Sequence, residues 1–191
     1  MQHKDKVIIL DFGSQYTQLI ARRIREAGVY SEIHPCSIEP DELKKLEPKA
    51  LVLSGGPASV CAEDAPMLAK EILDWGLPVL GICYGMQLLA WLGGAEIVPA
   101  KDREYGRAEF FFSQDSALWQ GIAAESFLKV WMSHGDTVLK VPAGFEVIGR
   151  TSQVDVAGMA NPEKGIYALQ FHPEVAHTEE GDQILRNFLF S

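Results

Sequence analysis

Short apolar runs alternate with amphipathic segments throughout the first half of the chain, and this alternation limits the fold more than any other feature. Residues 7–10, 50–53 and 79–82 have the character of buried strands, and residues 30–34 form a further candidate strand. The segments expected to be helices are residues 15–27, 41–46, 66–75 and 85–92. Strands that are buried on both faces and alternate with helices are typical of a parallel sheet with right-handed crossovers. We therefore predict a doubly wound α/β fold with a mostly parallel central sheet.

The second half is richer in strand-like runs separated by turn residues, which predicts an additional antiparallel strand region. The expected strands are residues 106–112, 127–131, 145–151, 154–160 and 166–171, and a helix with an apolar stripe is expected around residues 182–190. The sequence has no internal repeat, low-complexity tract or linker. Its length of 191 residues is within the range of one unit, so we predict a single domain spanning residues 1–191.

Composition narrows the classes of protein to consider. Hydrophobic residues make up 47% and charged residues 23% of the chain, as in an ordinary globular protein. The net charge of −9 argues against a nucleic-acid-binding protein and against docking on an anionic membrane. No apolar run approaches the roughly 20 residues that a membrane-spanning helix needs, and the N-terminus lacks the apolar core of a signal peptide. We expect a cytoplasmic protein.

In an open parallel sheet, chemistry collects beyond the carboxyl ends of the strands. Three of the predicted strand ends carry unusual residues: SGGP at residues 54–57, CYG at residues 83–85, and QFHPE at residues 170–174. Because these ends are expected to lie along the same edge of the sheet, they are the candidate site.

Cys83 stands in the run GICYG, residues 81–85, which matches the spacing of a strand–nucleophile–helix turn. A thiol just before a helix faces unpaired backbone N–H groups and the positive end of the helix dipole, which favour the thiolate. The N–H of Tyr84 would point at the same place, as half of an oxyanion hole. A small buried cysteine in a glycine-flanked turn would give the same pattern, so this motif alone leaves both interpretations open.

His172 follows the last predicted strand and lies two positions before Glu174. A histidine there can activate a thiol, and a carboxylate can orient its imidazole. His172 alone is more typical of a surface or hydrogen-bonded core histidine, but together with the turn at Cys83 the catalytic interpretation is favoured. A metal site built on His172, Glu174 and His177 is disfavoured, because the spacing is not H-E-x-x-H and no thiolate lies nearby in the sequence.

The glycine-rich run at residues 54–57 could bring backbone N–H groups close to a ligand, or could be an ordinary turn. It is similar to the SGGxDS loop of ATP pyrophosphatases, but Ala58 stands where that loop has Asp. Because G-x-x-x-x-G-K-[ST] and G-x-G-x-x-G are also absent, we expect no nucleotide or other cofactor on this chain. Cys36 and Cys61 are interpreted as bystanders. The arginines at positions 22, 23 and 25 are interpreted as a solvated helix face.

Taken together, the three strand-end motifs resemble those of the class I (triad) glutamine amidotransferases, a family with a flavodoxin-like fold. Four further runs resemble the amidotransferase domain of GMP synthetases in particular: DFGSQY at residues 11–16, REYGRAE at 103–109, MSHGD at 132–136 and HPEVAHT at 172–178. The resemblance covers essentially the whole chain.

This resemblance implies a role for each matching residue. Cys83 would be the nucleophile, His172 the acid and base, and Glu174 the carboxylate that orients the imidazole. The backbone N–H groups of Gly56 and Tyr84 would form the oxyanion hole. The amino-acid end of glutamine would be held by Gln87, Ser133 and Asp136.

The implied function is hydrolysis of L-glutamine through a thioester on Cys83. The ammonia would pass to an ATP-pyrophosphatase module, the expected partner, which uses ATP and Mg²⁺ to aminate xanthosine monophosphate to GMP. One alternative is a glutaminase component of another synthetase, such as those for anthranilate, aminodeoxychorismate or carbamoyl phosphate. A second alternative is a non-catalytic module that senses glutamine. The sequence does not decide whether the chain is a separate subunit or one domain of a longer chain.

Overall fold

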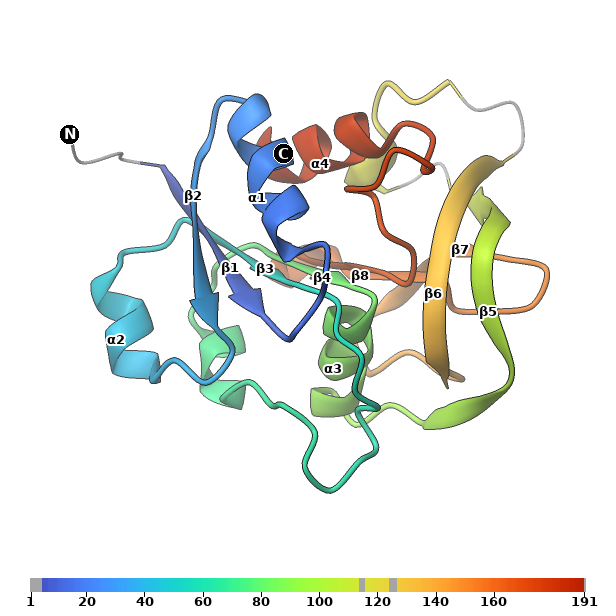
Figure 1. Cartoon of the computed structure of the whole chain (residues 1–191), viewed down its shortest axis with the longest axis horizontal. Helices are drawn as coiled ribbons and strands as arrows, with labels where there is room; N and C mark the ends of the chain where they lie inside the picture. The colour runs from blue at the N-terminus through green and yellow to red at the C-terminus, as the bar shows by residue number, and fades with distance from the viewer. Residues whose placement is uncertain (1–4, 114–115, 124–126, 191) are drawn as a thin grey trace.

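The computed structural model describes residues 5–113, 116–123 and 127–190, and within this part it describes the side chains of all residues except 100–104. Its described strands form one nine-stranded sheet in the order β2-β1-β3-β4-β9-β8-β7-β5-β6. Figure 1 shows this sheet with helices packed on both sides of its parallel part.

The parallel part of the sheet consists of five neighbouring strands. They are β2 (Tyr30–Pro35), β1 (Lys6–Asp11), β3 (Ala50–Leu53), β4 (Val79–Ile82) and β9 (Ile166–Leu169). The antiparallel part continues from β9 through β8 (Gly158–Asn161), β7 (Glu146–Arg150), β5 (Ile97–Phe112) and β6 (Leu128–Val138). This confirms the predicted fold class, a mostly parallel doubly wound sheet with an antiparallel extension.

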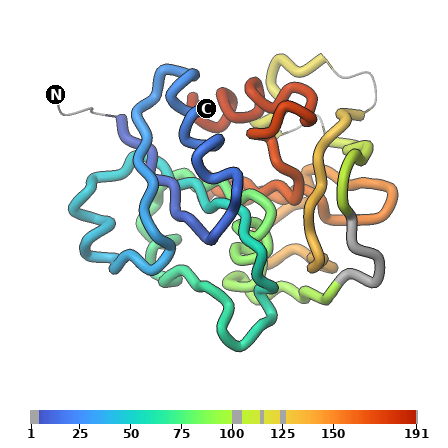
Figure 2. The backbone as a smooth tube through the Cα atoms, viewed as in Figure 1, coloured from blue at the N-terminus to red at the C-terminus, as the bar shows by residue number. Residues whose placement is uncertain are grey.

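Two apolar cores lie on opposite faces of the sheet, because successive side chains of a strand point to opposite faces. In β1, Val7 and Ile9 belong to the core that includes residues of α1 (Thr17–Glu26) and α4 (Gly181–Phe190). The neighbouring side chains Ile8 and Leu10 belong to the other core, with residues of α2 (Pro40–Lys45) and α3 (Tyr84–Leu92). Figures 1 and 2 show α1 and the C-terminal α4 side by side on one face.

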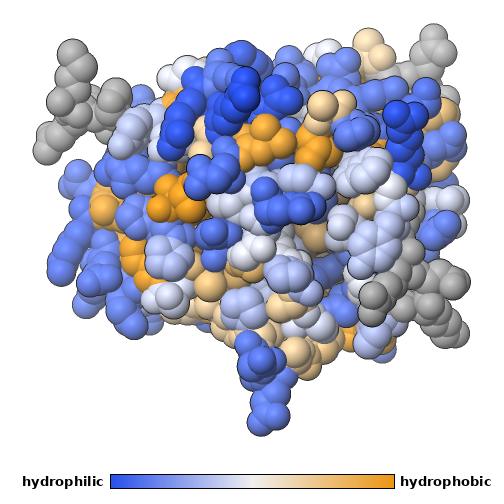
Figure 3. All heavy atoms as spheres, viewed as in Figure 1, coloured by the Kyte–Doolittle hydropathy of each residue, from blue (hydrophilic) through white to orange (hydrophobic). Residues whose placement is uncertain are grey.

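The surface seen from this side is mainly hydrophilic, with apolar side chains in small separate patches (Figure 3). Within the described residues, no helix combines the length and the hydropathy that crossing a membrane requires.

The prediction of a helix at residues 66–75 is wrong over most of that range. Only a short 3₁₀ helix, η1 (Lys70–Asp74), forms there, and Ala69 before it has an extended backbone. The carbonyl of Pro66 accepts a hydrogen bond of 2.6 Å from the Tyr84 hydroxyl. This tertiary contact, with the burial of Leu68 and Ile72, competes with the local helical pattern.

The strand predicted at residues 127–131 continues much further, as β6, to Val138. Its buried and less buried residues alternate along the whole strand, and it pairs with β5, which is also longer than predicted. Ser133, His134 and Asp136 therefore lie on a regular strand at one border of the site. The 3₁₀ helices η2 (Ala117–Trp119) and η3 (Pro162–Lys164) complete the described elements.

Candidate active site

The turn between β4 and α3 places Cys83 in a backbone conformation that is rare for a residue with a side chain, with φ 52° and ψ −104°. The chain can bend this sharply because of the glycine on each side. A Cβ at Gly81 would lie 2.7 Å from the Gly85 carbonyl oxygen, and a Cβ at Gly85 would lie 2.4 Å from the Leu53 carbonyl oxygen. The G-x-C-x-G spacing is thus a steric requirement of the turn.

The side chain of Cys83 is buried beside the first turn of α3, with 4% of the residue's surface exposed. Its Sγ lies 3.3 Å from the carbonyl oxygen of Ser133 on β6 and donates a hydrogen bond to it. Gly55 approaches from the β3 side, where an added Cβ would lie 3.0 Å from Cε1 of His172 and 3.5 Å from Cβ of Cys83. The three predicted strand ends therefore do meet at one place.

His172 is held just beyond β9 by hydrogen bonds to both of its backbone polar groups. Its N–H donates to the Trp131 carbonyl oxygen at 3.1 Å, and its own carbonyl oxygen accepts from the Thr178 hydroxyl at 2.6 Å. The ring of Tyr16 packs edge-on against the imidazole, with 5.1 Å between centroids. The orientation of the imidazole is thus set before any ligand binds.

The imidazole Nδ1 of His172 hydrogen-bonds Oε1 of Glu174 at 2.7 Å, and both residues are almost completely buried. Burial alone lowers the pKa of His172, but hydrogen bonds with Cys83 and Glu174 and the charges of both groups raise it, to about 10. Nδ1 is therefore occupied by its hydrogen bond to the carboxylate, and Nε2 is the nitrogen that is available for proton transfer with the thiol.

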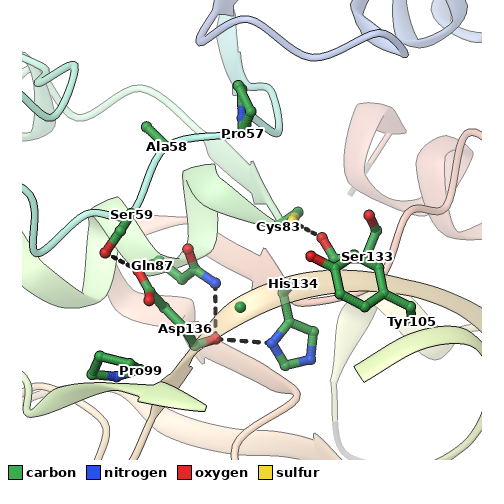
Figure 4. Close-up of a pocket in the computed structure, with 12 residues that line it drawn as sticks. Pro57, Ala58, Ser59, Cys83, Gln87, Pro99, Tyr105, Ser133, His134 and Asp136 are labelled. Atoms are coloured by element: carbon green, nitrogen blue, oxygen red, sulfur yellow. Dashed lines mark hydrogen bonds between the residues drawn. The ribbon is translucent and has the colours of Figure 1, made fainter. Parts of the chain in front are cut away.

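A cavity of about 530 Å³ opens beside Cys83 (Figure 4). Five of the predicted site residues line it: Gly56, Cys83, Gln87, Ser133 and Asp136. Tyr84 does not line this cavity, because its ring packs against Phe12 and its hydroxyl bonds Pro66. Burial raises the pKa of the Tyr84 phenol to about 12. The side chain of Tyr84 therefore takes no part in this cavity, and the oxyanion role of its backbone N–H stays a prediction.

Asp136 connects three walls of this cavity. Its Oδ2 accepts hydrogen bonds from the Ser59 hydroxyl at 2.6 Å and from the Val60 N–H at 3.1 Å. Its backbone carbonyl accepts from Nε2 of Gln87 at 3.0 Å and from Nδ1 of His134 at 2.8 Å. The loop after β3, the helix α3 and the strand β6 are thereby held together around the cavity.

A smaller cavity of about 230 Å³ lies against Cys83 and His172, with Gly13, Ser14, Gln15 and Tyr16 in its wall. Both cavities include Gly56, Pro57 and Ser133 as well as Cys83. The thiol therefore borders two spaces, and the imidazole borders the smaller one.

The family model described as glutamine amidotransferase class-I matches residues 8–191. The chain belongs to the class-I glutamine amidotransferase family. It is 60% identical over 190 residues to the GMP synthase [glutamine-hydrolyzing] of Maridesulfovibrio salexigens, and 51% identical over 187 residues to that of Brachyspira hyodysenteriae. The matches cover 100% and 98% of this chain but 37% and 36% of those relatives, so the chain spans little more than a third of their length.

Solved structures agree with this membership. A protein from Thermoplasma acidophilum, described as a putative GMP synthase subunit, superposes with a TM-score of 0.88 at 36% identity, covering 97% of this chain and 92% of that one. A glutamine amidotransferase from Thermotoga maritima has a TM-score of 0.71 at 22% identity, over 91% of this chain and 77% of that one. The second likeness bears on the fold alone.

In this class-I amidotransferase, several site residues were not found from the sequence. Tyr16 packs on His172, Ser59 bonds Asp136, and His134 bonds the Asp136 backbone. Tyr16 and His134 stand inside runs that carry the resemblance, so the runs themselves were the available signal. Arg23 also does more than face solvent, because its Nε donates to the Glu174 carbonyl oxygen at 3.2 Å.

The other two cysteines, Cys36 and Cys61, line neither of the two cavities beside Cys83. Burial raises the pKa of the Cys36 thiol and of the Cys61 thiol, which disfavours their thiolates. Among the described residues, no group of three or more His, Cys, Asp and Glu side chains is placed to hold a metal ion.

Proposed function

We propose that this chain hydrolyses the side-chain amide of L-glutamine to glutamate and ammonia. The observation that carries the proposal is the pairing of a strained, buried thiol with an imidazole whose other nitrogen is fixed by a buried carboxylate, at the wall of a cavity of about 530 Å³. Membership of the class-I glutamine amidotransferase family supports it.

The reaction begins with attack of the Cys83 thiolate on the amide carbon, while the imidazolium form of His172 holds the proton. The backbone N–H groups of Gly56 and Tyr84 stabilise the oxyanion. His172 gives its proton to the departing nitrogen, so the C–N bond breaks and ammonia leaves with a thioester on Cys83. Water then attacks the thioester, His172 takes one of its protons, and glutamate is released as the thiolate and the imidazolium re-form. Glu174 keeps Nδ1 protonated throughout.

We assign the amino-acid end of glutamine to the part of the cavity formed by Gln87, Ser133 and Asp136. Gln87 is on α3 four positions after Cys83, about 6 Å further along the helix. That separation fits the span from the reacting amide of glutamine to its α-carbon substituents.

We further propose that the ammonia supplies an ATP-pyrophosphatase module, which uses ATP and Mg²⁺ to aminate xanthosine monophosphate to GMP. The relatives described above are named glutamine-hydrolysing GMP synthases and extend well beyond the matched region. This favours GMP formation over a synthetase for anthranilate, aminodeoxychorismate or carbamoyl phosphate. No nucleotide-binding role is assigned to this chain.

A glutaminase assay with and without the ATP-pyrophosphatase module of a GMP synthetase tests both parts of the proposal. We expect glutamate release that depends on Cys83 and rises when the module is present with its substrates. Glutamate release that persists in Cys83→Ala would contradict the assigned chemistry. Stimulation only by another class of synthetase would contradict the assigned partner.

A further inference from the structure

Gln170 belongs to a buried chain of hydrogen bonds behind the main cavity. It follows β9 and is fully buried, and its backbone N–H donates to the Ala157 carbonyl oxygen at 2.9 Å. Its side-chain Oε1 lies 3.3 Å from Nε2 of Gln87, which also donates to the Asp136 carbonyl oxygen at 3.0 Å. Gln87 lines the cavity, whereas Gln170 lines neither of the two cavities beside Cys83.

The backbone carbonyl of Asp136 determines which way both amides face. A carbonyl oxygen accepts hydrogen bonds and cannot donate one, so the Gln87 atom beside it must be the nitrogen. The Gln170 atom facing that same nitrogen must in turn be the oxygen. With these two contacts, both hydrogens of the Gln87 amide nitrogen are used. The oxygen of the Gln87 amide is then the atom that can accept a hydrogen bond from a ligand in the cavity.

In this orientation of Gln170, its own side-chain nitrogen makes no hydrogen bond to any described residue. Among the described residues, Nε2 of Gln170 is a buried atom without a hydrogen-bond partner. Such atoms are rare and unfavourable in folded proteins. An amide at position 170 thus contributes through its oxygen, as an acceptor for Gln87.

We propose that Gln170 is a positioning residue that holds the Gln87 amide with its oxygen toward the cavity, where it accepts a hydrogen bond from the α-ammonium group of the substrate. This inference rests on the proposed glutaminase function. A carboxylate has no proton to donate to this oxygen, so the α-carboxylate of the substrate is excluded from that position. The side-chain amide is also excluded, because it must lie at Cys83, about one helical turn away.

The inference predicts a change in selectivity, which a general disturbance of the site would not produce. Glutaramate has the same amide and carboxylate as glutamine but lacks the α-amino group. Binding of L-glutamine and of glutaramate would be measured by NMR titration in a Cys83→Ala background, so that neither ligand is turned over. The variants are Gln170→Met, which has similar length and no acceptor, and Gln170→Glu, which keeps an acceptor oxygen. Gln183→Met is the matched control, because it removes an amide bonded to Asn187 on α4.

We expect Gln170→Met to weaken glutamine binding by roughly tenfold or more, the effect of a hydrogen bond to a charged group, and to leave glutaramate binding within about twofold. Gln170→Glu should retain the preference for glutamine, and Gln183→Met should change neither ligand. Equal weakening of both ligands by Gln170→Met, or no weakening of either, would overturn the inference alone. Absence of glutamine binding with Gln170 intact would overturn the proposed function itself.

A second readout needs no ligand. The side-chain amide protons of Gln87 are expected to exchange with solvent several-fold faster in Gln170→Met than in the chain with Gln170, because one of their two acceptors is gone. Unchanged exchange in a folded Gln170→Met protein would show that Gln170 does not hold the Gln87 amide.

Discussion

The imidazole Nδ1 of His172 and the carboxylate Oε1 of Glu174 lie 2.7 Å apart, in side chains that are 4% and 0% exposed. A carboxylate buried this completely keeps its charge only with a close proton donor, and the imidazole N–H is that donor. The pair is therefore one unit, in which Glu174, together with the hydrogen bond to Cys83, maintains a protonated His172.

Replacing Glu174 with Gln should lower the pKa of His172 and the turnover rate together. The neutral amide keeps the shape of the side chain but removes the negative charge, and its oxygen is a weaker acceptor for the Nδ1–H than the carboxylate oxygen is. We expect kcat for glutamine to fall by roughly 100-fold, measured with an NMR titration of the His172 ring. Glu163→Gln, an exposed site on η3, is the control. An unchanged His172 titration would show that Glu174 does not set the pKa.

The raised pKa of His172 predicts how stability depends on pH. The folded-state pKa is about 10 and the ordinary value is 6.5. Below about pH 8.5, however, the unfolded chain still holds the corresponding proton on its cysteine thiol, so the folded pair of His172 and Cys83 holds an extra proton only between about pH 8.5 and 10. The resulting stabilisation is greatest between about pH 6.5 and 8.5 and is lost as the pH rises toward 10, at up to about 1.4 kcal/mol per pH unit. Urea unfolding at several pH values should therefore show a steeper decline for the wild-type chain than for His172→Gln. Parallel curves would contradict the assignment.

Gly56→Ala should disturb the loop that is proposed to supply one oxyanion N–H group. An added Cβ would lie 2.4 Å from the Phe12 carbonyl oxygen, and a backbone atom cannot move aside as a flexible side chain can. We expect a loss of about 1–3 kcal/mol in the free energy of unfolding and a lower kcat. A variant with wild-type stability and turnover would show that this close approach has no consequence.

Ser59→Ala should loosen the cavity wall rather than the catalytic groups. It removes the 2.6 Å hydrogen bond to Asp136 but leaves the Val60 N–H contact. We expect KM for glutamine to rise roughly three- to tenfold with little change in kcat, the effect of about one hydrogen bond. Ser152→Ala, at an exposed position, is the matched control. An unchanged KM would mean that Asp136 does not need Ser59 for its placement.

The catalytic turn could be predicted because its signal is local. Gly81 and Gly85 lie within two positions of Cys83. The close approach that requires Gly81 is to the Gly85 carbonyl within the same turn, whereas the one that requires Gly85 is to the Leu53 carbonyl on β3. The parallel strands could also be predicted from the sequence, since a strand that is buried on both faces, such as β3, is a continuous apolar run. Where the geometry depends on one short stretch of backbone, the local residue pattern is enough to predict it.

Contacts between distant segments could not be predicted in this way. Ser59 and Asp136 are 77 positions apart, and Gln87 and Gln170 are 83 apart. The sequence around each of these residues does not indicate which distant residue it contacts. The strand predicted at residues 127–131 ended too early, because the polar residues Ser133, His134 and Asp136 interrupt the apolar pattern of β6. The failed helix at residues 66–75 has the same origin, a tertiary hydrogen bond from Tyr84 that outweighs local propensity.

The nucleophilic role of Cys83 is tested most directly by a glutamine-like electrophile. A diazoketone analogue of L-glutamine would be added to the native chain, and the modified peptide identified by mass spectrometry. We predict one covalent adduct on Cys83, none on Cys36 or Cys61, and protection by L-glutamine. An unlabelled Cys83, or labelling that L-glutamine does not prevent, would contradict a thiol poised at a glutamine site.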